Sequence, residues 1–269
     1  MGRSGLVMQF KVFSHERESM ATSNLCLHAG AGLVSLERLR EYQAPPPEGR
    51  WYPIAHATVL DTVKDTLGEA GYRVQAEKLA VSREGARFFG TLDLATPVAS
   101  GVALAVGIRN STDKSFPLGF CAGNRVFVCD NLAFRSELLV RRKHTLNGAR
   151  NFSAAIAQAV MSLADFKTTE AARITAMMHT ELRSELADSL ILRSFEKGII
   201  SAPQLSRVLH EWREPSFEEF QPRTVWSLFN AFTTVLRDRA TRQPARFAVQ
   251  TMRLNAVLDP SRPETVHAA

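Results

Sequence analysis

From residue 72 onward, the apolar residues of this chain change their spacing once, near Gly148, and this change limits the folds open to it. Before it, from 72 to 145, short runs alternate apolar and polar residues and are rich in β-formers, as half-buried strands are. After it, from 150 to 240, apolar residues such as Phe152, Ile156 and Val160 recur at helical spacing. Strands followed by helices predict an α+β fold: an antiparallel β-meander of about five strands, then a helical C-terminal half packed on the sheet.

Turn and cap residues divide the chain further. We expect a flexible extension over 1–23, a single α+β domain over 24–240, and a C-terminal helix and tail over 241–269. Pro53 and Gly71 bound an early helix, Gly198 ends the helix over 181–197, and Ser201 caps the helix that follows. The stretch 97–101 is a turn and the polar run 110–115 is a loop. The pair Gly123-Asn124 is typical of a two-residue hairpin turn. Predicted strands cover 72–81, 87–95, 101–109, 116–122, 125–129 and 138–142, and predicted helices cover 33–42, 53–71, 152–178, 181–197, 201–212, 224–237 and 245–258.

Positive charge is concentrated in one part of the chain. The net charge is +6, and residues 101–150 carry 8 Lys and Arg against 3 Asp and Glu. A local surplus indicates a polyanionic partner, although a solvated basic face that keeps the protein soluble is an equal alternative. No apolar run is long enough to span a membrane, and the N-terminus lacks the apolar region of a signal peptide, so we expect a cytoplasmic protein without membrane contact.

The segment 109–145 holds most of that surplus. Its polar side chains suit phosphate oxygens, and Phe116, Phe120, Phe127 and Phe134 lie among its charges, where they either stack bases or belong to the core. Adjacent strand residues face opposite sides, so Arg141 and Arg142 would not share a face. We expect nucleic-acid contacts from Arg109, Asn110, Ser111, Lys114, Arg125, Asn131, Arg141, Arg142, Lys143 and His144.

The sequence lacks the common catalytic signatures. It has no phosphate-binding loop, dinucleotide-binding glycine motif, HExxH or nucleophile elbow, and no zinc-type Cys/His spacing, so we expect neither cofactor nor metal. Two alternatives stay open. Asp113 and Asp130, with Glu137 or His144, could hold Mg²⁺ in a nuclease. The Trp- and Phe-rich helical half could instead expose an apolar patch to a protein partner, as in a regulatory or anti-defence module.

Five motifs resemble one known family. They are LCLHAGA (25–31), RNSTDKSFPLG (109–119), FVCDNLAF (127–134), RKHT (142–145) and WSLFNAFT (226–233), and they run from about residue 24 to 240. Together they are similar to the phage/plasmid-like family called domain of unknown function 932, which often has His and Glu where this chain has Thr112 and Thr234. The family occurs on mobile elements, often among genes that handle single-stranded or replicating DNA.

The resemblance also bears on function. A β-meander followed by helices is similar to the core of phage single-strand annealing proteins, which assemble into rings or filaments. This analogy of fold implies a non-catalytic protein that binds or anneals single-stranded DNA in phage or plasmid recombination, as a homo-oligomer.

Overall fold

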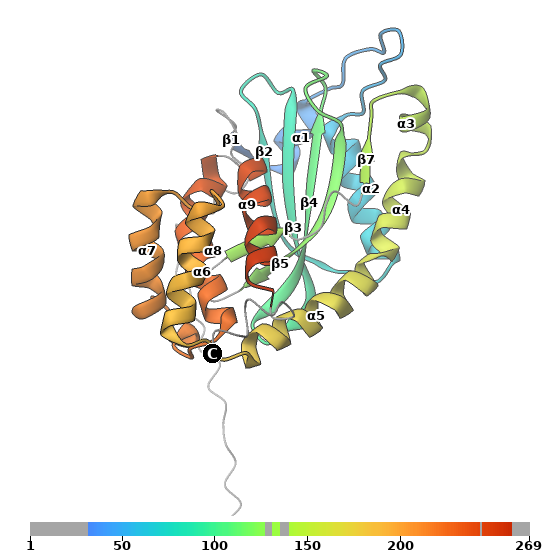
Figure 1. Cartoon of the computed structure of the whole chain (residues 1–269). Coiled ribbons are helices and arrows are strands. Elements are labelled where there is room, and N and C mark those ends of the chain that lie inside the picture. Colours follow the sequence, from blue (N-terminus) through green and yellow to red (C-terminus); the bar gives the residue numbers. More distant parts are fainter. Residues whose placement is uncertain (1–31, 127–130, 135–139, 243, 260–269) are drawn as a thin grey trace, which may run out of the picture.

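The predicted order of strands and then helices is confirmed in the computed structural model, which describes residues 32–126, 131–134, 140–242 and 244–259 (Figure 1). Within these residues the strands form a seven-stranded antiparallel sheet in the order β1-β2-β3-β4-β5-β6, and β7 pairs with β5 next to β6. The strands are β1 (Gly32–Val34), β2 (Val74–Val81), β3 (Arg87–Ala99), β4 (Val102–Ser111), β5 (Leu118–Val126), β6 (Asn131–Phe134) and β7 (Val140–Arg142).

The helices follow their predicted signals closely. Gly71 and Gly198 adopt positive φ after α2 and α6, and Ser201 forms a capping box with Gln204 at the start of α7. The predicted helix over 152–178 is two helices that meet at Ser162. The helices are α1 (Leu36–Glu41), α2 (His56–Glu69), α3 (Leu146–Arg150), α4 (Phe152–Met161), α5 (Leu163–His179), α6 (Ser184–Glu196), α7 (Ala202–Arg213), a 3₁₀ turn (Glu218–Phe220), α8 (Val225–Arg242) and α9 (Pro244–Val257).

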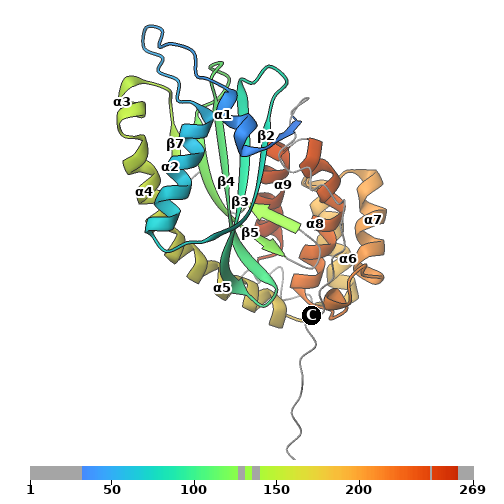
Figure 2. The same ribbon diagram turned by 180° about the vertical axis from the view of Figure 1, so that it is seen from behind.

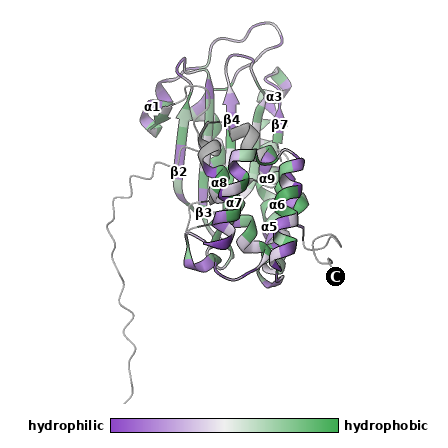
Figure 3. Cartoon of the chain, turned by 60° about the vertical axis from the view of Figure 1, so that its left-hand side comes forward, coloured by the Kyte–Doolittle hydropathy of each residue, from purple (hydrophilic) through white to green (hydrophobic). Residues whose placement is uncertain are grey.

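Helices cover the sheet from two sides. Helix α2 packs on β2 and β4 and α4 packs on β7, whereas α8 and α9 pack on β6 and lie on the other side of the sheet (Figures 1 and 2). As a result every residue of β4 from 102 to 108 is buried, as its unbroken apolar run predicts. The long helices carry hydrophobic residues beside hydrophilic ones (Figure 3). Among the described residues, none of the helices could cross a membrane.

The predicted Gly-Asn hairpin turn is wrong. Gly123 and Asn124 lie inside β5, where they pair with Ala105 and Leu104 of β4. The Asn124 side chain is buried and donates a hydrogen bond to Oε1 of Glu170 on α5, at 2.6 Å. A local turn signal was therefore overridden by a contact with a helix that follows 46 residues later.

Three further boundaries differ from the prediction. Asn110 and Ser111 are not in a loop but are the last residues of β4, paired with Phe88 and Arg87. Pro97, expected in a turn, lies in β3 at a shift of register. Helix α2 begins at His56 rather than near Pro53.

Candidate nucleic-acid interface

Two of the predicted cationic residues lie in one row of the sheet. Arg109 of β4 pairs with Gly119 of β5, and Gly119 pairs with Arg141 of β7. Paired residues of antiparallel strands point to the same face, so the two arginines share a face with a glycine between them. On the other side of Arg109, the same row continues to Phe89 of β3.

The Arg109 guanidinium lies among aromatic rings. Its Cζ is 5.5 Å from the centre of the Phe116 ring, and the Phe116 and Phe89 rings are 5.3 Å apart. Burial and, after it, the positive charge of Arg141 lower the pKa of Arg109. Its Nε is buried and has no hydrogen-bond partner among the described residues. A half-buried cation that faces a second cation is an arrangement that a bound anion stabilises.

The edge strand β7 carries the rest of the basic cluster. Arg141, Arg142 and Lys143 are exposed, and Arg142 pairs with Leu118, so it faces the side opposite to Arg141, as predicted. A groove runs between β7 and α4, lined by Val140, Arg141, Arg142, Ala155, Gln158, Ala159 and Ser162. In the described part of the chain, Arg109, Arg141, Arg142 and Lys143 form no salt bridge. We call these four residues the basic cluster.

Lys114 differs from the basic cluster because its charge is neutralised. Its Nζ lies 2.6 Å from Oε2 of Glu48 and 4.9 Å from the centre of the Trp51 ring. Lys114 also adopts φ 66°, a conformation that side chains other than glycine rarely adopt. Its contacts tie the loop between β4 and β5 to the segment before α2.

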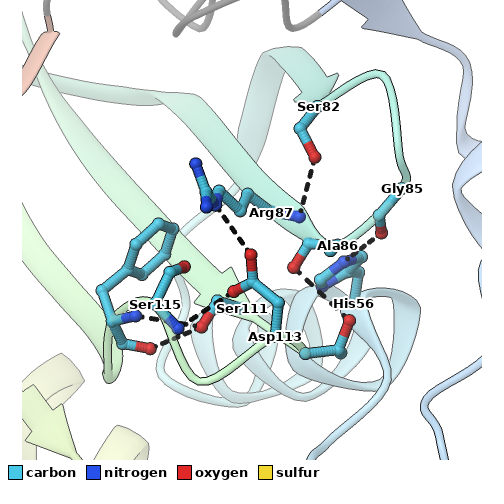
Figure 4. Close-up of polar contacts among 10 residues, drawn as sticks. His56, Ser82, Gly85, Ala86, Arg87, Ser111, Asp113 and Ser115 are labelled. Atoms are coloured by element: carbon cyan, nitrogen blue, oxygen red, sulfur yellow. Dashed lines mark hydrogen bonds and ion pairs between the residues drawn. The ribbon is translucent and has the colours of Figure 1, made fainter.

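Asn110 is an internal residue rather than a surface donor. Its side-chain Nδ2 donates to the carbonyl of Ile54 (2.8 Å) and to Nδ1 of His56 (3.0 Å), and the residue is fully buried. His56 Nε2 lies 3.0 Å from the Gly85 carbonyl (Figure 4). A carbonyl can only accept, so Nε2 carries the proton and Nδ1 is free to accept from Asn110. Burial lowers the pKa of His56, which agrees with this neutral form.

Ser111 and His144 are also buried. The Ser111 hydroxyl donates to the Phe116 carbonyl at 2.7 Å (Figure 4). The His144 carbonyl accepts from the backbone N–H of Tyr52 at 2.9 Å, and burial lowers the pKa of the His144 ring. Asn110, Ser111 and His144 therefore hold the end of the sheet together, and their side chains are not available to a ligand on the surface.

Of the remaining expected residues, some lie in strands and some lie outside the residues that the structure describes. Arg125 and Asn131 lie in β5 and β6, where their backbone register is set. Phe120 is a core residue. Phe127, Asp130 and Glu137 lie outside the described residues.

The acids proposed for a nuclease are only partly described. Asp113 accepts from Nε of Arg87 at 2.8 Å and from the backbone N–H of Ser115 at 3.0 Å (Figure 4). The Asp113 carboxylate is therefore already bound by Arg87 in an ion pair and by a backbone N–H of its own loop. Within the described residues no group of three His, Cys, Asp or Glu side chains could hold a metal ion.

The aromatic residues of the helical half are mostly core. Trp212, Trp226 and Phe232 are buried, and Asn230 donates to the Trp226 carbonyl at 3.0 Å, a backbone bond of the kind its apolar surroundings predict. On α6 the apolar side chains of Leu192 and Phe195 are exposed one turn apart. These buried aromatic residues therefore do not form the apolar patch expected of a protein-interaction module.

The fold and the basic cluster define an α+β protein with a basic edge on its sheet. The chain belongs to the family described as domain of unknown function (DUF932), whose model matches residues 47–258. The match covers the sheet from β2 onward and the helices from α2 to α9. No curated protein and no solved structure matches the chain.

Proposed function

We propose that this protein binds single-stranded DNA at the basic cluster, without catalysing a reaction on it. The observation that carries the proposal is the row Arg109–Gly119–Arg141, in which two guanidinium groups share a face and no described carboxylate neutralises them. The exposed side chains of Arg142 and Lys143 continue the positive surface around the edge strand.

A phosphodiester backbone matches this arrangement. Guanidinium groups bind phosphate oxygens through paired, charge-assisted hydrogen bonds, and these are strongest where the cation is partly shielded from water. Arg109 is half-buried, so an anion beside it gains more than one beside a fully exposed side chain. Arg87 and Lys114 already have acidic partners and offer a phosphate less.

A preference for single strands follows from the rings beside Arg109. Phe116 lies under its guanidinium and next to Phe89, on the face that carries Arg141. Cations interleaved with aromatic rings bind the backbone and stack unpaired bases, whereas the bases of a duplex are already stacked. Assembly into a homo-oligomer, as annealing proteins do, is part of the proposal, and light scattering with and without oligonucleotide tests it.

The test compares two triple variants that remove the same charge. In the first, Arg141, Arg142 and Lys143 become Ala. In the second, Arg40, Lys64 and Arg213 become Ala, each of which has an acidic partner on the surface: Asp61, Glu77 and Asp188. Both change the net charge by the same amount, so a general electrostatic effect acts on them equally.

The measurement is the affinity for a labelled single-stranded oligonucleotide across a salt series. Each phosphate contact contributes ~0.7 to the slope of log K against log salt. For the 141–143 variant the slope of log K against log salt should be smaller by up to about 2, whereas the control should have the slope of the unaltered protein. Equal slopes for both variants would remove the basic cluster from the site.

A further inference from the structure

A segment before α2 projects beyond the end of the sheet, beside the basic cluster. We call residues 43–53 the arm. It follows α1, carries three consecutive prolines at 45–47, and extends above the sheet near the start of α3 (Figures 1 and 2). Consecutive prolines favour an extended, semi-rigid backbone, so the arm does not behave as a random coil.

The tip of the arm is a tight turn. Glu48 and Trp51 exchange both backbone hydrogen bonds, at 3.0 and 2.9 Å, with Gly49 and Arg50 between them. Gly49 has φ 56°, and a positive φ is what the first central position of such a turn requires, which is why glycine suits it. The turn presents the exposed Arg50 to solvent, and no carboxylate of the described residues forms a salt bridge with it.

Two contacts fix the arm to residues that lie close to the basic cluster in the chain. The Glu48 carboxylate pairs with Lys114 at 2.6 Å, and Lys114 also lies over the Trp51 ring. The backbone N–H of Tyr52 donates to the carbonyl of His144 at 2.9 Å, and His144 directly follows Lys143. The arm is thus joined to the loop before β5 and to the chain that leaves β7.

We propose that the arm forms a second wall of the nucleic-acid site and that Arg50 binds a phosphate of the strand held by the basic cluster. This inference rests on the proposed function. Arg50 is two residues from Tyr52, a reach of about 7 Å along an extended chain, and Lys143 is one residue from the carbonyl that Tyr52 contacts. Arg50 and Lys143 are therefore near enough to contact neighbouring phosphates of one strand.

The same geometry gives Lys114 a different role from the one expected. Its ammonium neutralises Glu48, so the arm offers the strand the charge of Arg50 without an opposing carboxylate. Lys114 then positions the arm, and Arg50 provides the phosphate contact that the sequence pattern assigned to Lys114.

The test is the salt dependence of oligonucleotide binding by Arg50→Ala, alone and combined with Arg142→Ala. Arg40→Ala on α1, whose partner is Asp61, is the matched control for the loss of one exposed arginine. We expect Arg50→Ala to reduce the log–log slope by ~0.7, and the double variant to reduce it by ~1.4. Arg50→Glu should weaken binding further than Arg50→Ala, because it places a negative charge beside the strand.

The outcomes separate this inference from the function on which it rests. If the 141–143 variant loses slope but Arg50→Ala behaves like Arg40→Ala, the arm is not part of the site and the proposed function stands. If neither variant changes the slope, both proposals fail. A melting temperature of Arg50→Ala equal to that of the unaltered protein shows that the exposed tip was changed without disturbing the fold.

Discussion

Arg109 of β4 and Arg141 of β7 lie on the same face of the sheet with Gly119 between them, and burial and, after it, the charge of Arg141 lower the pKa of Arg109. Two like charges held together contribute nothing favourable to the folded chain by themselves. Residues that serve binding rather than folding should therefore be replaceable without loss of stability. The variants of this row distinguish the two roles.

Replacing Arg141 by Ala should leave the fold intact and weaken binding. The side chain is exposed and removing it relieves repulsion, so the melting temperature at low salt should stay within about 2 °C of the original or rise. Affinity for a single-stranded oligonucleotide should fall in the same buffer. A clear drop in melting temperature would instead assign Arg141 to the stability of the sheet.

Replacing Asn110 by Ala should destabilise the protein by about 2–3 kcal/mol. The change leaves the half-buried Ile54 carbonyl and the buried His56 Nδ1 without their donor. Urea unfolding measures this loss, and Asn147→Ala on the exposed surface of α3, expected to change stability by less than about 0.5 kcal/mol, is the control. Equal unfolding midpoints for the two variants would contradict the role given to Asn110.

Stability should fall as the pH is lowered through the ordinary histidine value of 6.5. Burial lowers the pKa of His56 and of His144 in the folded state, so the unfolded chain takes up protons first. Above pH 6.5 the two histidines are neutral in both the folded and the unfolded protein, so their contribution to the free energy of unfolding does not change with pH. Below it, each histidine reduces the free energy of unfolding by up to about 1.4 kcal/mol per pH unit until its folded form also protonates.

Urea unfolding at pH 7.5, 6.5 and 5.5 measures this dependence. His56→Gln keeps an amide that can donate to Gly85 but removes the titrating ring, so its stability should depend less steeply on pH. A free energy of unfolding that stays constant over this range in the unaltered protein would show that the two rings are not held neutral.

Breaking the ion pair of α5 should be costly. Glu170 pairs with Arg173, the two side chains are only 1% and 10% exposed, and Glu170 also accepts from Asn124 of β5. Glu170→Gln leaves the Arg173 charge buried without its partner, an expected loss of about 3–5 kcal/mol. Arg173→Met in the same chain should recover part of it, and a double-mutant cycle measures the coupling. Asp188→Asn, in an exposed pair with Arg213, should cost less than about 1 kcal/mol.

The sequence predicted those features of the fold whose signals are local. The helix ends at Gly71 and Gly198 and the capped start at Ser201 depend on residues close by in the chain, and each was confirmed. The Gly123-Asn124 turn failed because its signal, although local, competes with the ladder to β4 and with Glu170. Neither partner can be recognised from the residues around the pair.

The sequence predicted that basic residues are concentrated in one segment, but not which of them lie on the same face of the sheet. Strand alternation predicted that Arg141 and Arg142 face opposite sides, and their pairing with Gly119 and Leu118 confirms it. The register of the strands decides that Arg109 shares a face with Arg141 and that Asn110 faces inward. This register cannot be predicted from the residues around each position. The role proposed for Arg50 was not expected from the sequence, because a lone arginine after a proline run carries no signal until Tyr52 is seen against His144.

The most direct test of the account is the binding of the unaltered protein to labelled single-stranded and duplex oligonucleotides of equal length, by fluorescence anisotropy across a salt series, with and without Mg²⁺. We predict tighter binding to the single strand, a steep loss of affinity with salt, and no cleavage when Mg²⁺ is present. No binding to either oligonucleotide at low salt would contradict the central claim, and Mg²⁺-dependent cleavage would contradict the non-catalytic role.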